Sequence, residues 1–187
     1  MKIKESGMSN EKVWEGFFNP YKILRTLGLD KKITDVVEFG CGYGTFTIPA
    51  AKMVSGKIYA IDMEPVMLEI TKEKAKEGKL DNVVTVQRDF ITEGSGLDAE
   101  SVDYVMIFNI LHGEESEKLL EESWRILKHN GIIGIIHWNY DPKTPRGPPM
   151  SIRLRPEQCI ELAKSSGFDN PRIYDLKPYH YGIILKK

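Results

Sequence analysis

Three glycines that alternate along the chain have the clearest chemical meaning. Gly40, Gly42 and Gly44 follow a short apolar run at 36–39 and precede a predicted helix at 46–54. Glycine tolerates a positive φ and has no Cβ to collide with a ligand, and the first N–H groups of a helix are unpaired. The pattern predicts a loop whose backbone comes close to a ligand.

The residues around these glycines indicate which ligand to expect. A dinucleotide loop has the spacing G-x-G-x-x-G, and its third glycine would fall where this chain has Thr45. Glu38, just before the loop, would repel a pyrophosphate but would attract an ammonium group. Cys41, inside the loop, is expected to be a small packing residue beside the ligand and not a reactive thiol. These features favour a ligand that carries an amino acid.

Acidic residues end the second and third apolar runs. Asp62 lies about 20 residues beyond the loop, where a carboxylate can accept both hydroxyls of a ribose, although it could also cap the next helix. Met63 can lie against the face of a purine. Asp89 could accept a hydrogen bond from an exocyclic amine of adenine, with Phe90 flanking the ring opposite Met63. The pattern predicts that the ligand contains a nucleoside.

Polar residues follow the fourth apolar run, at 102–108. Asn109 and His112 are expected beside the same crevice, so four strand ends converge on one ligand. His112 and His137 are candidates for a base if the substrate reacts through a hydroxyl or an activated carbon. A histidine near a strand end is more often structural, so no catalytic residue is assigned.

The elements that must hold these residues alternate along the middle of the chain. Short β-branched runs predict parallel strands at 36–39, 57–61, 83–86, 102–108 and 132–136. Helical patterns lie between them at 46–54, 65–77 and 114–127, and Lys128-His129-Asn130-Gly131 is a stop signal for the last. Right-handed crossovers would wind these units into an α/β, doubly wound sheet with helices on both faces.

The two ends of the chain differ from this middle part. An aromatic N-terminal segment with Trp14, Phe17 and Phe18 predicts two short helices, which are either core or a lid that excludes water. After the fifth strand come a Pro- and Gly-rich loop at 141–149, a helix at 156–166, and a hairpin with arms at 172–176 and 181–185. Tyr140, Arg146 and Met150 are candidates for substrate contact.

Length and composition limit the class of protein. The 187 residues fit one domain, 1–187, in which 1–30 would form the helical lid segment. A net charge of -1 gives no reason to expect nucleic acid, so a small-molecule substrate is the better expectation. The two cysteines suggest neither a disulfide nor a metal site, and without an apolar leader or spanning run we expect a cytoplasmic protein that does not insert into a membrane. A monomer and a homodimer remain equally open.

The motifs resemble those of the class I S-adenosylmethionine (SAM)-dependent methyltransferases, especially the small branch similar to ubiquinone/menaquinone-biosynthesis methyltransferases. The resemblance rests on 38–44, Asp62, Asp89-Phe90 and Asn109, and it covers nearly the whole chain. It implies a Rossmann-like, seven-stranded, mostly parallel sheet of order 3-2-1-4-5-7-6 with strand 7 antiparallel. It also implies SAM as methyl donor, with S-adenosylhomocysteine (SAH) as product.

The resemblance further implies a role for each of these residues. Gly40, Gly42 and Gly44 would cradle the methionine moiety, Asp62 would hold the ribose, Asp89 and Phe90 would bind adenine, and Asn109 would lie near the sulfonium. Ile110-Leu111-His112 departs from the Pro-Pro-aromatic run of the enzymes that methylate exocyclic or amide nitrogens of nucleic acids and proteins. The expected acceptor is therefore a small molecule.

Two other functions stay open. A protein that binds SAM as a sensor without turnover would need no base, and none is evident here. An NAD-dependent oxidoreductase on a related sheet would share Asp62, but Thr45 and Glu38 count against it.

Overall fold

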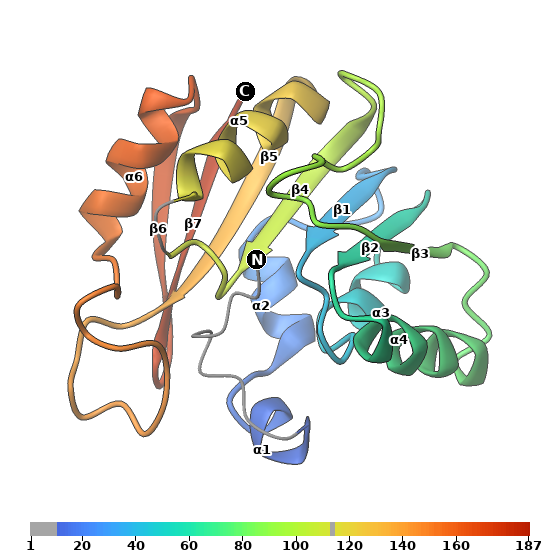
Figure 1. Cartoon of the computed structure of the whole chain (residues 1–187), viewed down its shortest axis with the longest axis horizontal. Coiled ribbons are helices and arrows are strands. Elements are labelled where there is room, and N and C mark those ends of the chain that lie inside the picture. The colour runs from blue at the N-terminus through green and yellow to red at the C-terminus, as the bar shows by residue number, and fades with distance from the viewer. Residues whose placement is uncertain (1–10, 113–114) are drawn as a thin grey trace.

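The computed structural model describes residues 11–112 and 115–187, and its centre is one seven-stranded sheet (Figure 1). The strands are β1 (Val36–Phe39), β2 (Ile58–Asp62), β3 (Val83–Gln87), β4 (Val102–Phe108), β5 (Leu127–Trp138), β6 (Asp169–Leu176) and β7 (His180–Lys186). Their order is β3-β2-β1-β4-β5-β7-β6, and only β7 runs antiparallel to both of its neighbours among these strands. The sheet order and the antiparallel strand that the resemblance implied are confirmed.

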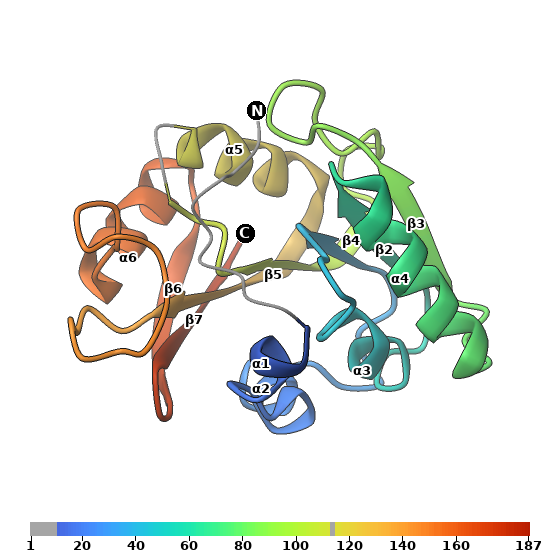
Figure 2. The ribbon, with the colours of Figure 1, turned by 60° about the horizontal axis from the view of Figure 1, so that its bottom comes forward.

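Helices cover both faces of this sheet (Figure 2). They are α1 (Glu11–Glu15), α2 (Pro20–Thr26), α3 (Thr47–Ala51), α4 (Pro65–Glu77), α5 (Ser116–Ile126) and α6 (Pro156–Ser165). The first four lie towards one face, where α3 touches both α2 and α4, and α5 packs against α6 on the other. The bounds of α4 agree with the prediction, whereas α3 is shorter than the expected 46–54.

Alternation along the strands produces two separate cores. Successive side chains of a strand point to opposite faces, so Val37 and Val105 join the core under α5 and α6. Val36 and Tyr104 join the core under α2 and α3 instead. Burial on both faces explains why these runs are apolar at nearly every position.

The helix α5 ends one residue before the predicted Leu127, but residues 128–131, which were predicted to be a helix stop, already belong to β5. The helix ends at Ile126, and Leu127 is already extended, with φ -68 and ψ 134. Leu127 pairs with Val102, and the Lys128 ammonium contacts the Asp103 carboxylate at 3.1 Å. Strand pairing therefore draws the chain out of the helix before the Asn-Gly pair is reached, and Glu114, the expected first helical residue, lies outside the described residues.

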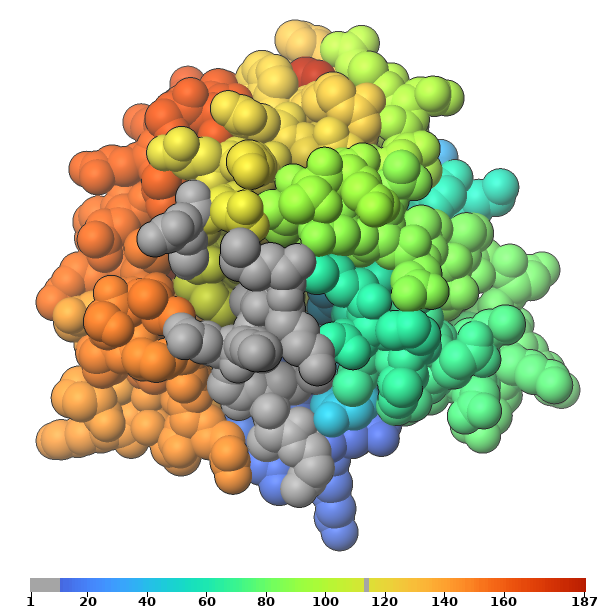
Figure 3. Space-filling view, viewed as in Figure 1, coloured from blue at the N-terminus to red at the C-terminus, as the bar shows by residue number. Residues whose placement is uncertain are grey.

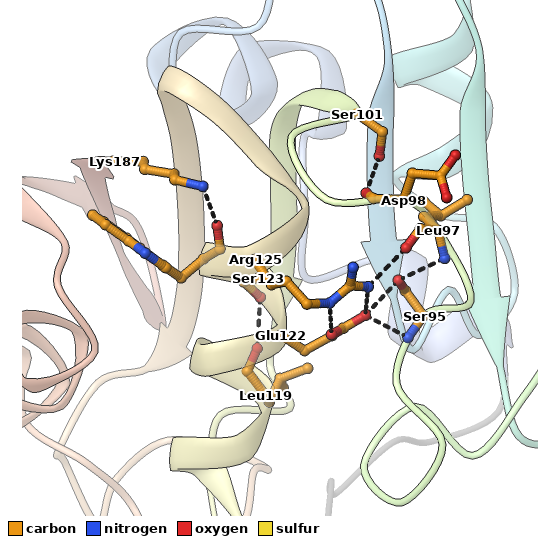
Figure 4. Close-up of polar contacts among 10 residues, drawn as sticks. Ser95, Leu97, Asp98, Ser101, Leu119, Glu122, Ser123, Arg125 and Lys187 are labelled. Atoms are coloured by element: carbon orange, nitrogen blue, oxygen red, sulfur yellow. Dashed lines mark hydrogen bonds and ion pairs between the residues drawn. The ribbon is translucent and has the colours of Figure 1, made fainter.

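A polar network ties α5 to the loop that joins β3 to β4 (Figure 4). The Glu122 carboxylate accepts hydrogen bonds from the backbone N–H and the hydroxyl of Ser95 at 2.7 and 2.5 Å. Arg125 contacts the same carboxylate at 2.7 Å and donates to the Leu97 carbonyl. These bonds hold the loop between β3 and β4 against α5.

The aromatic N-terminal segment packs on the sheet through rings. Trp14 is 7% exposed and lies against Phe18 and Trp138, with ring centroids 5.1 and 6.4 Å apart. Lys74 of α4 forms ion pairs with Glu11 and Glu15 of α1. Residues 1–10 of the predicted lid lie outside the described residues.

Candidate functional site

The glycine loop lies at the carboxyl end of β1 and turns with positive φ at each of its glycines. The φ values are 68° at Gly40, 52° at Gly42 and 72° at Gly44, a region that residues with a Cβ rarely adopt. A Cβ at Gly40 would lie 3.1 Å from a side-chain carbon of Ile110, and one at Gly44 would lie 3.0 Å from the Thr71 hydroxyl oxygen. The loop therefore has little tolerance for side chains.

Asp62 connects this loop to the end of β2. One carboxylate oxygen accepts from the Gly42 N–H at 2.9 Å, and the other accepts from the Glu64 N–H at 3.0 Å, just before α4. Burial raises the pKa of Asp62, and the N–H groups of Glu64 and Gly42 partly oppose this. The N-cap of α4 is Glu64 and not Asp62, so Asp62 contacts the start of the helix only through the Glu64 N–H, and its role at a ribose stays a prediction.

A second carboxyl group, Glu38, lies behind the loop and is 2% exposed. It accepts a hydrogen bond from the Thr47 hydroxyl of α3. Burial raises the pKa of Glu38 to about 8, the Thr47 hydrogen bond opposes this, and the nearby Asp62 charge adds to it. A ligand with a positive charge would favour ionised Glu38, whereas a pyrophosphate would not.

Cys41 is 4% exposed and packs in a small cluster with Ala60 and Leu68. Its sulfur lies 3.9 Å from the Thr71 hydroxyl. Burial raises the pKa of the thiol, and the charges of Glu38 and Asp62 raise it further. The thiolate is thus disfavoured, as expected of a packing residue.

The residues expected around adenine differ in how deeply their side chains are buried. Asp89 is half-buried and accepts from the N–H groups of Ile91 and Thr92. Phe90 is 3% exposed, and its ring centroid lies 5.2 Å from that of Phe39 in the core. Met63 is half-buried against the same core cluster. The structure thus places Phe90 largely within the core, and its contact with adenine stays a prediction.

Asn109, directly after β4, has an unusual conformation and environment. Its φ is 61°, its backbone N–H donates to the Ile136 carbonyl at 2.8 Å, and it is 2% exposed. Neither the oxygen nor the nitrogen of its side-chain amide has a hydrogen-bond partner in the described chain. Buried polar atoms are nearly always paired, so this amide fits a site that a polar ligand completes.

Three of the four histidines are buried near the carboxyl ends of β4 and β5. The rings of His112 and His137 lie 6.2 Å apart, and His180 packs on Trp138 at 4.2 Å. Burial lowers the pKa of His112 and of His137 to about 4, and that of His180 to about 3. All three rings are therefore neutral near pH 7.

Arg153, which the sequence analysis missed, shapes the loop after β5. The residue is 6% exposed, and its guanidinium donates to four backbone carbonyls and one hydroxyl of that loop, which belong to Asn139, Asp141, Thr144, Arg146 and Pro148. Gly147, with φ 119°, packs against the same guanidinium and Trp138. In the space-filling view the orange atoms of this part of the chain form the lower left of the molecule (Figure 3).

Thr47 and Thr71 were also missed. Thr71 of α4 donates to the Gly42 carbonyl at 3.1 Å, and both threonines are fully buried. A polar, β-branched residue on the apolar side of a helix is the signal that could have singled them out.

Comparison with known proteins identifies the family. A family model described as a methyltransferase domain matches residues 36–131, which is more than half of the chain. The chain belongs to this methyltransferase-domain family. The matched segment includes the glycine loop, Asp62 and Asn109.

Several relatives of this methyltransferase-domain protein differ in their acceptors. Aklanonic acid methyltransferase DauC of Streptomyces sp. (strain C5) is 28% identical over 163 residues, 84% of this chain and 73% of that protein. The ribosomal protein L11 methyltransferase of Anoxybacillus flavithermus is 30% identical over 103 residues, 55% of this chain, which spans only 31% of that protein's length. A crystal structure of a SAM-dependent methyltransferase from Aquifex aeolicus superimposes with a TM-score of 0.80 at 25% identity, covering 95% of this chain and 93% of that one.

The cofactor of this methyltransferase-domain protein is SAM, as the resemblance implied. The narrower ubiquinone/menaquinone-like branch stays a prediction. Among residues 11–112 and 115–187, no group of three or more His, Cys, Asp or Glu side chains could hold a metal ion. In the same part of the chain, no helix is long and apolar enough to cross a membrane.

Proposed function

We propose that this protein transfers the methyl group of SAM to a small-molecule acceptor. The observation that carries the proposal is the placement of two buried carboxyl groups, Glu38 and Asp62, against one glycine loop. Two acids at this place favour a ligand with an ammonium group and a ribose over one with a pyrophosphate.

The proposed binding roles follow from this placement. Gly40, Gly42 and Gly44 offer close backbone approach to the methionine moiety, with Glu38 behind them. Asp62, whose carboxylate is fixed by two N–H groups, accepts from the ribose hydroxyls. The segment Asp89-Phe90 lies at the end of β3, where it would border the adenine.

The proposed acceptor is a small molecule and not a protein. DauC, whose name describes an acid as substrate, aligns over most of both chains, whereas the L11 methyltransferase aligns over about a third of its own length. The L11 enzyme therefore has a large part that this chain does not match. The acceptor would lie over β4 and β5, beside Asn109 and the loop that Arg153 holds.

SAM supplies a methyl group that is already electrophilic because it is bonded to a sulfonium. The side chains of the site therefore need to align the acceptor and exclude water. The loop at 139–150 would form one wall, because Arg153 fixes its backbone. The aromatic rings of Trp14 and Phe17 against Trp138 would close the face nearest to α1.

Calorimetry with SAH and with NAD tests the ligand class directly. Binding of SAH without binding of NAD is expected, and the opposite result would favour an oxidoreductase. Incubation with methyl-labelled SAM and a panel of phenols, quinols and thiols then distinguishes an enzyme from a sensor. A sensor would bind SAM and label none of the acceptors.

A further inference from the structure

Lys74 of α4 is the cation of a cluster of ion pairs that joins α4 to α1. Its ammonium lies 3.1 Å from the Glu15 carboxylate and also pairs with that of Glu11. The Lys74 side chain is 26% exposed, so its ammonium is only partly in water. A single exposed ion pair contributes little, but one ammonium shared by two carboxylates forms a small network. The cluster is therefore an anchor for α1 on α4.

The charges of this cluster do not change near pH 7. Burial alone would lower the pKa of Lys74, but the hydrogen bonds with Glu11 and Glu15 raise it above its usual value. The ammonium therefore stays ionised. Salt, which screens partly exposed charges, is the condition that weakens these pairs.

The same face of α4 also supports the glycine loop. Thr71 precedes Lys74 by three residues, and residues with this spacing are neighbours on one face of a helix. The Thr71 hydroxyl donates to the Gly42 carbonyl at 3.1 Å. A Cβ at Gly44 would lie 3.0 Å from the same hydroxyl oxygen. The anchor of α1 therefore lies next to the contact between α4 and the loop.

Aromatic rings attach the same N-terminal segment to other parts of the sheet. Trp14 and Phe17 pack on Trp138 at the end of β5, with ring centroids 6.4 and 5.4 Å apart. Phe18 packs on Phe46, just after the glycine loop, with centroids 5.1 Å apart. The segment is thus held by charges at α4 and by rings at β5 and at the start of α3.

The order of the strands places these attachments on both sides of the proposed cofactor site. α4 follows β2, Trp138 ends β5, and β1 and β4 lie between these two strands in the sheet. The glycine loop follows β1, and Asn109 follows β4. Residues 11–18 therefore form a strap across the carboxyl ends of the two strands that carry the proposed site.

We propose that Lys74 is a positioning residue for retention of the cofactor. By pairing with Glu11 and Glu15 it holds the strap beside the glycine loop, and release of SAM or SAH requires that these pairs break. Lys74 acts through the strap and takes no part in the chemistry. The rings on Trp138 keep the strap attached when the pairs break, so the opening is local. This inference rests on the proposed function for the identity of the ligand.

The rate at which SAH leaves the full protein tests the role of Lys74. Protein loaded with tritiated SAH is mixed with excess unlabelled SAH, and the bound label is followed with time. Lys74→Met keeps an unbranched apolar side chain and removes the charge. We expect it to release SAH about fivefold faster, the effect of two partly exposed ion pairs. The matched variant Lys72→Met, which removes an exposed pair with Glu69 on the same helix, should release SAH at the wild-type rate.

Reversal of the charges separates a role in holding the strap from a general loss of packing. Lys74→Glu should release SAH faster than Lys74→Met, because three carboxylates then repel one another. Adding Glu11→Lys and Glu15→Lys to Lys74→Glu should restore slow release. Raising the NaCl concentration should speed release from the wild-type protein more than from Lys74→Met, because only the wild-type protein has these pairs to screen.

The role of Lys74 is wrong if Lys74→Met releases SAH at the wild-type rate, or if Lys72→Met speeds release as much. It is also wrong if salt affects the wild-type protein and Lys74→Met equally. Should the variant with three reversed charges fail to fold, the rates of the two methionine variants and their dependence on salt still decide. Failure of SAH to bind to the wild-type protein would instead overturn the proposed methyl transfer.

Discussion

At the scale of single residues, the site depends on carboxyl groups whose hydrogen-bond donors come from the chain itself. Asp62 receives N–H groups from the loop and from the start of α4, and Glu38 receives the Thr47 hydroxyl. These bonds hold the acids in place before a ligand arrives, which lowers the cost of binding.

Removing the charge of Asp62 should weaken cofactor binding without unfolding the protein. We expect Asp62→Asn to reduce SAH affinity in calorimetry by about tenfold or more, because a hydrogen bond to a charged group contributes roughly 1.5–3 kcal/mol. Glu69→Gln, on the exposed side of α4, removes a carboxylate outside the site and should bind SAH normally. Equal affinity of both variants would contradict the role of Asp62.

Glu38 should couple cofactor binding to proton release. Its pKa of about 8 in the folded protein lies above the usual 4.5, so near pH 7 the group holds a proton that the unfolded chain would have lost. Its contribution to stability is therefore present at low pH and is lost as pH rises from about 4.5 to 8. An ammonium group beside it favours ionisation, so SAH affinity should rise with pH and level off above about 8.

The measurement is calorimetry of SAH binding at pH 7 in buffers of different ionisation enthalpy. The wild-type protein should release part of a proton on binding, and Glu38→Gln should release none from this group. A wild-type binding enthalpy that does not vary with the buffer would show that Glu38 stays protonated or is ionised beforehand.

At the scale of elements, the loop between β3 and β4 is held by two side chains of α5, Glu122 and Arg125. Glu122 accepts from both the backbone and the hydroxyl of Ser95, and Arg125 adds an ion pair. Hydrogen bonding of Glu122 to Arg125 and Ser95 outweighs its partial burial and lowers the pKa of this carboxyl. The position of the loop between β3 and β4 therefore depends on an ionised Glu122.

Loss of this carboxylate should loosen the loop and lower stability. We expect Glu122→Ala to reduce the free energy of unfolding in urea by about 1–3 kcal/mol, because two donors of Ser95 lose their acceptor. Glu121→Ala, exposed on the same helix, should change it by less than about 0.5 kcal/mol. Indistinguishable unfolding curves for the two variants would mean that water replaces the carboxylate at no cost.

At the scale of the whole molecule, α1 and α2 bring aromatic rings onto the end of the sheet. Phe17 lies 5.4 Å from Trp138 and 5.9 Å from Tyr179, and Phe18 lies 5.1 Å from Phe46. The segment thus connects the loop of the β6–β7 hairpin with the helix after the glycine loop. Trp14 is both part of a packed cluster and close to the proposed acceptor wall.

Replacement of Trp14 tests whether its ring is part of the core or part of a lid over the site. We expect Trp14→Ala to lower the free energy of unfolding by about 3 kcal/mol, the cost typical of removing a buried aromatic ring. Val13→Ala, at an exposed position of the same helix, is the control. If Trp14→Ala lost methyl transfer while unfolding at the wild-type urea concentration, the ring would be a lid and not part of the core.

The sequence alone predicted the parallel strands and the helices between them, and it placed the candidate site residues at one edge of the sheet, whereas the order of the strands came from the family resemblance. The predictions from sequence were possible because glycine spacing, β-branched runs and acids at strand ends are local features, and parallel strands bring their carboxyl ends to one edge. The early start of β5, at Leu127 and not at Ile132, was missed because pairing of Leu127 with Val102 decided it.

Only the tertiary structure decided which polar groups have hydrogen-bond partners. Arg153 lies fifteen residues beyond Trp138 and binds the loop between them, and His112 meets His137 from a different strand end. No local pattern encodes either contact, because each depends on where the chain returns after a loop. Burial then makes these rings neutral, and burial is a property of the packed molecule.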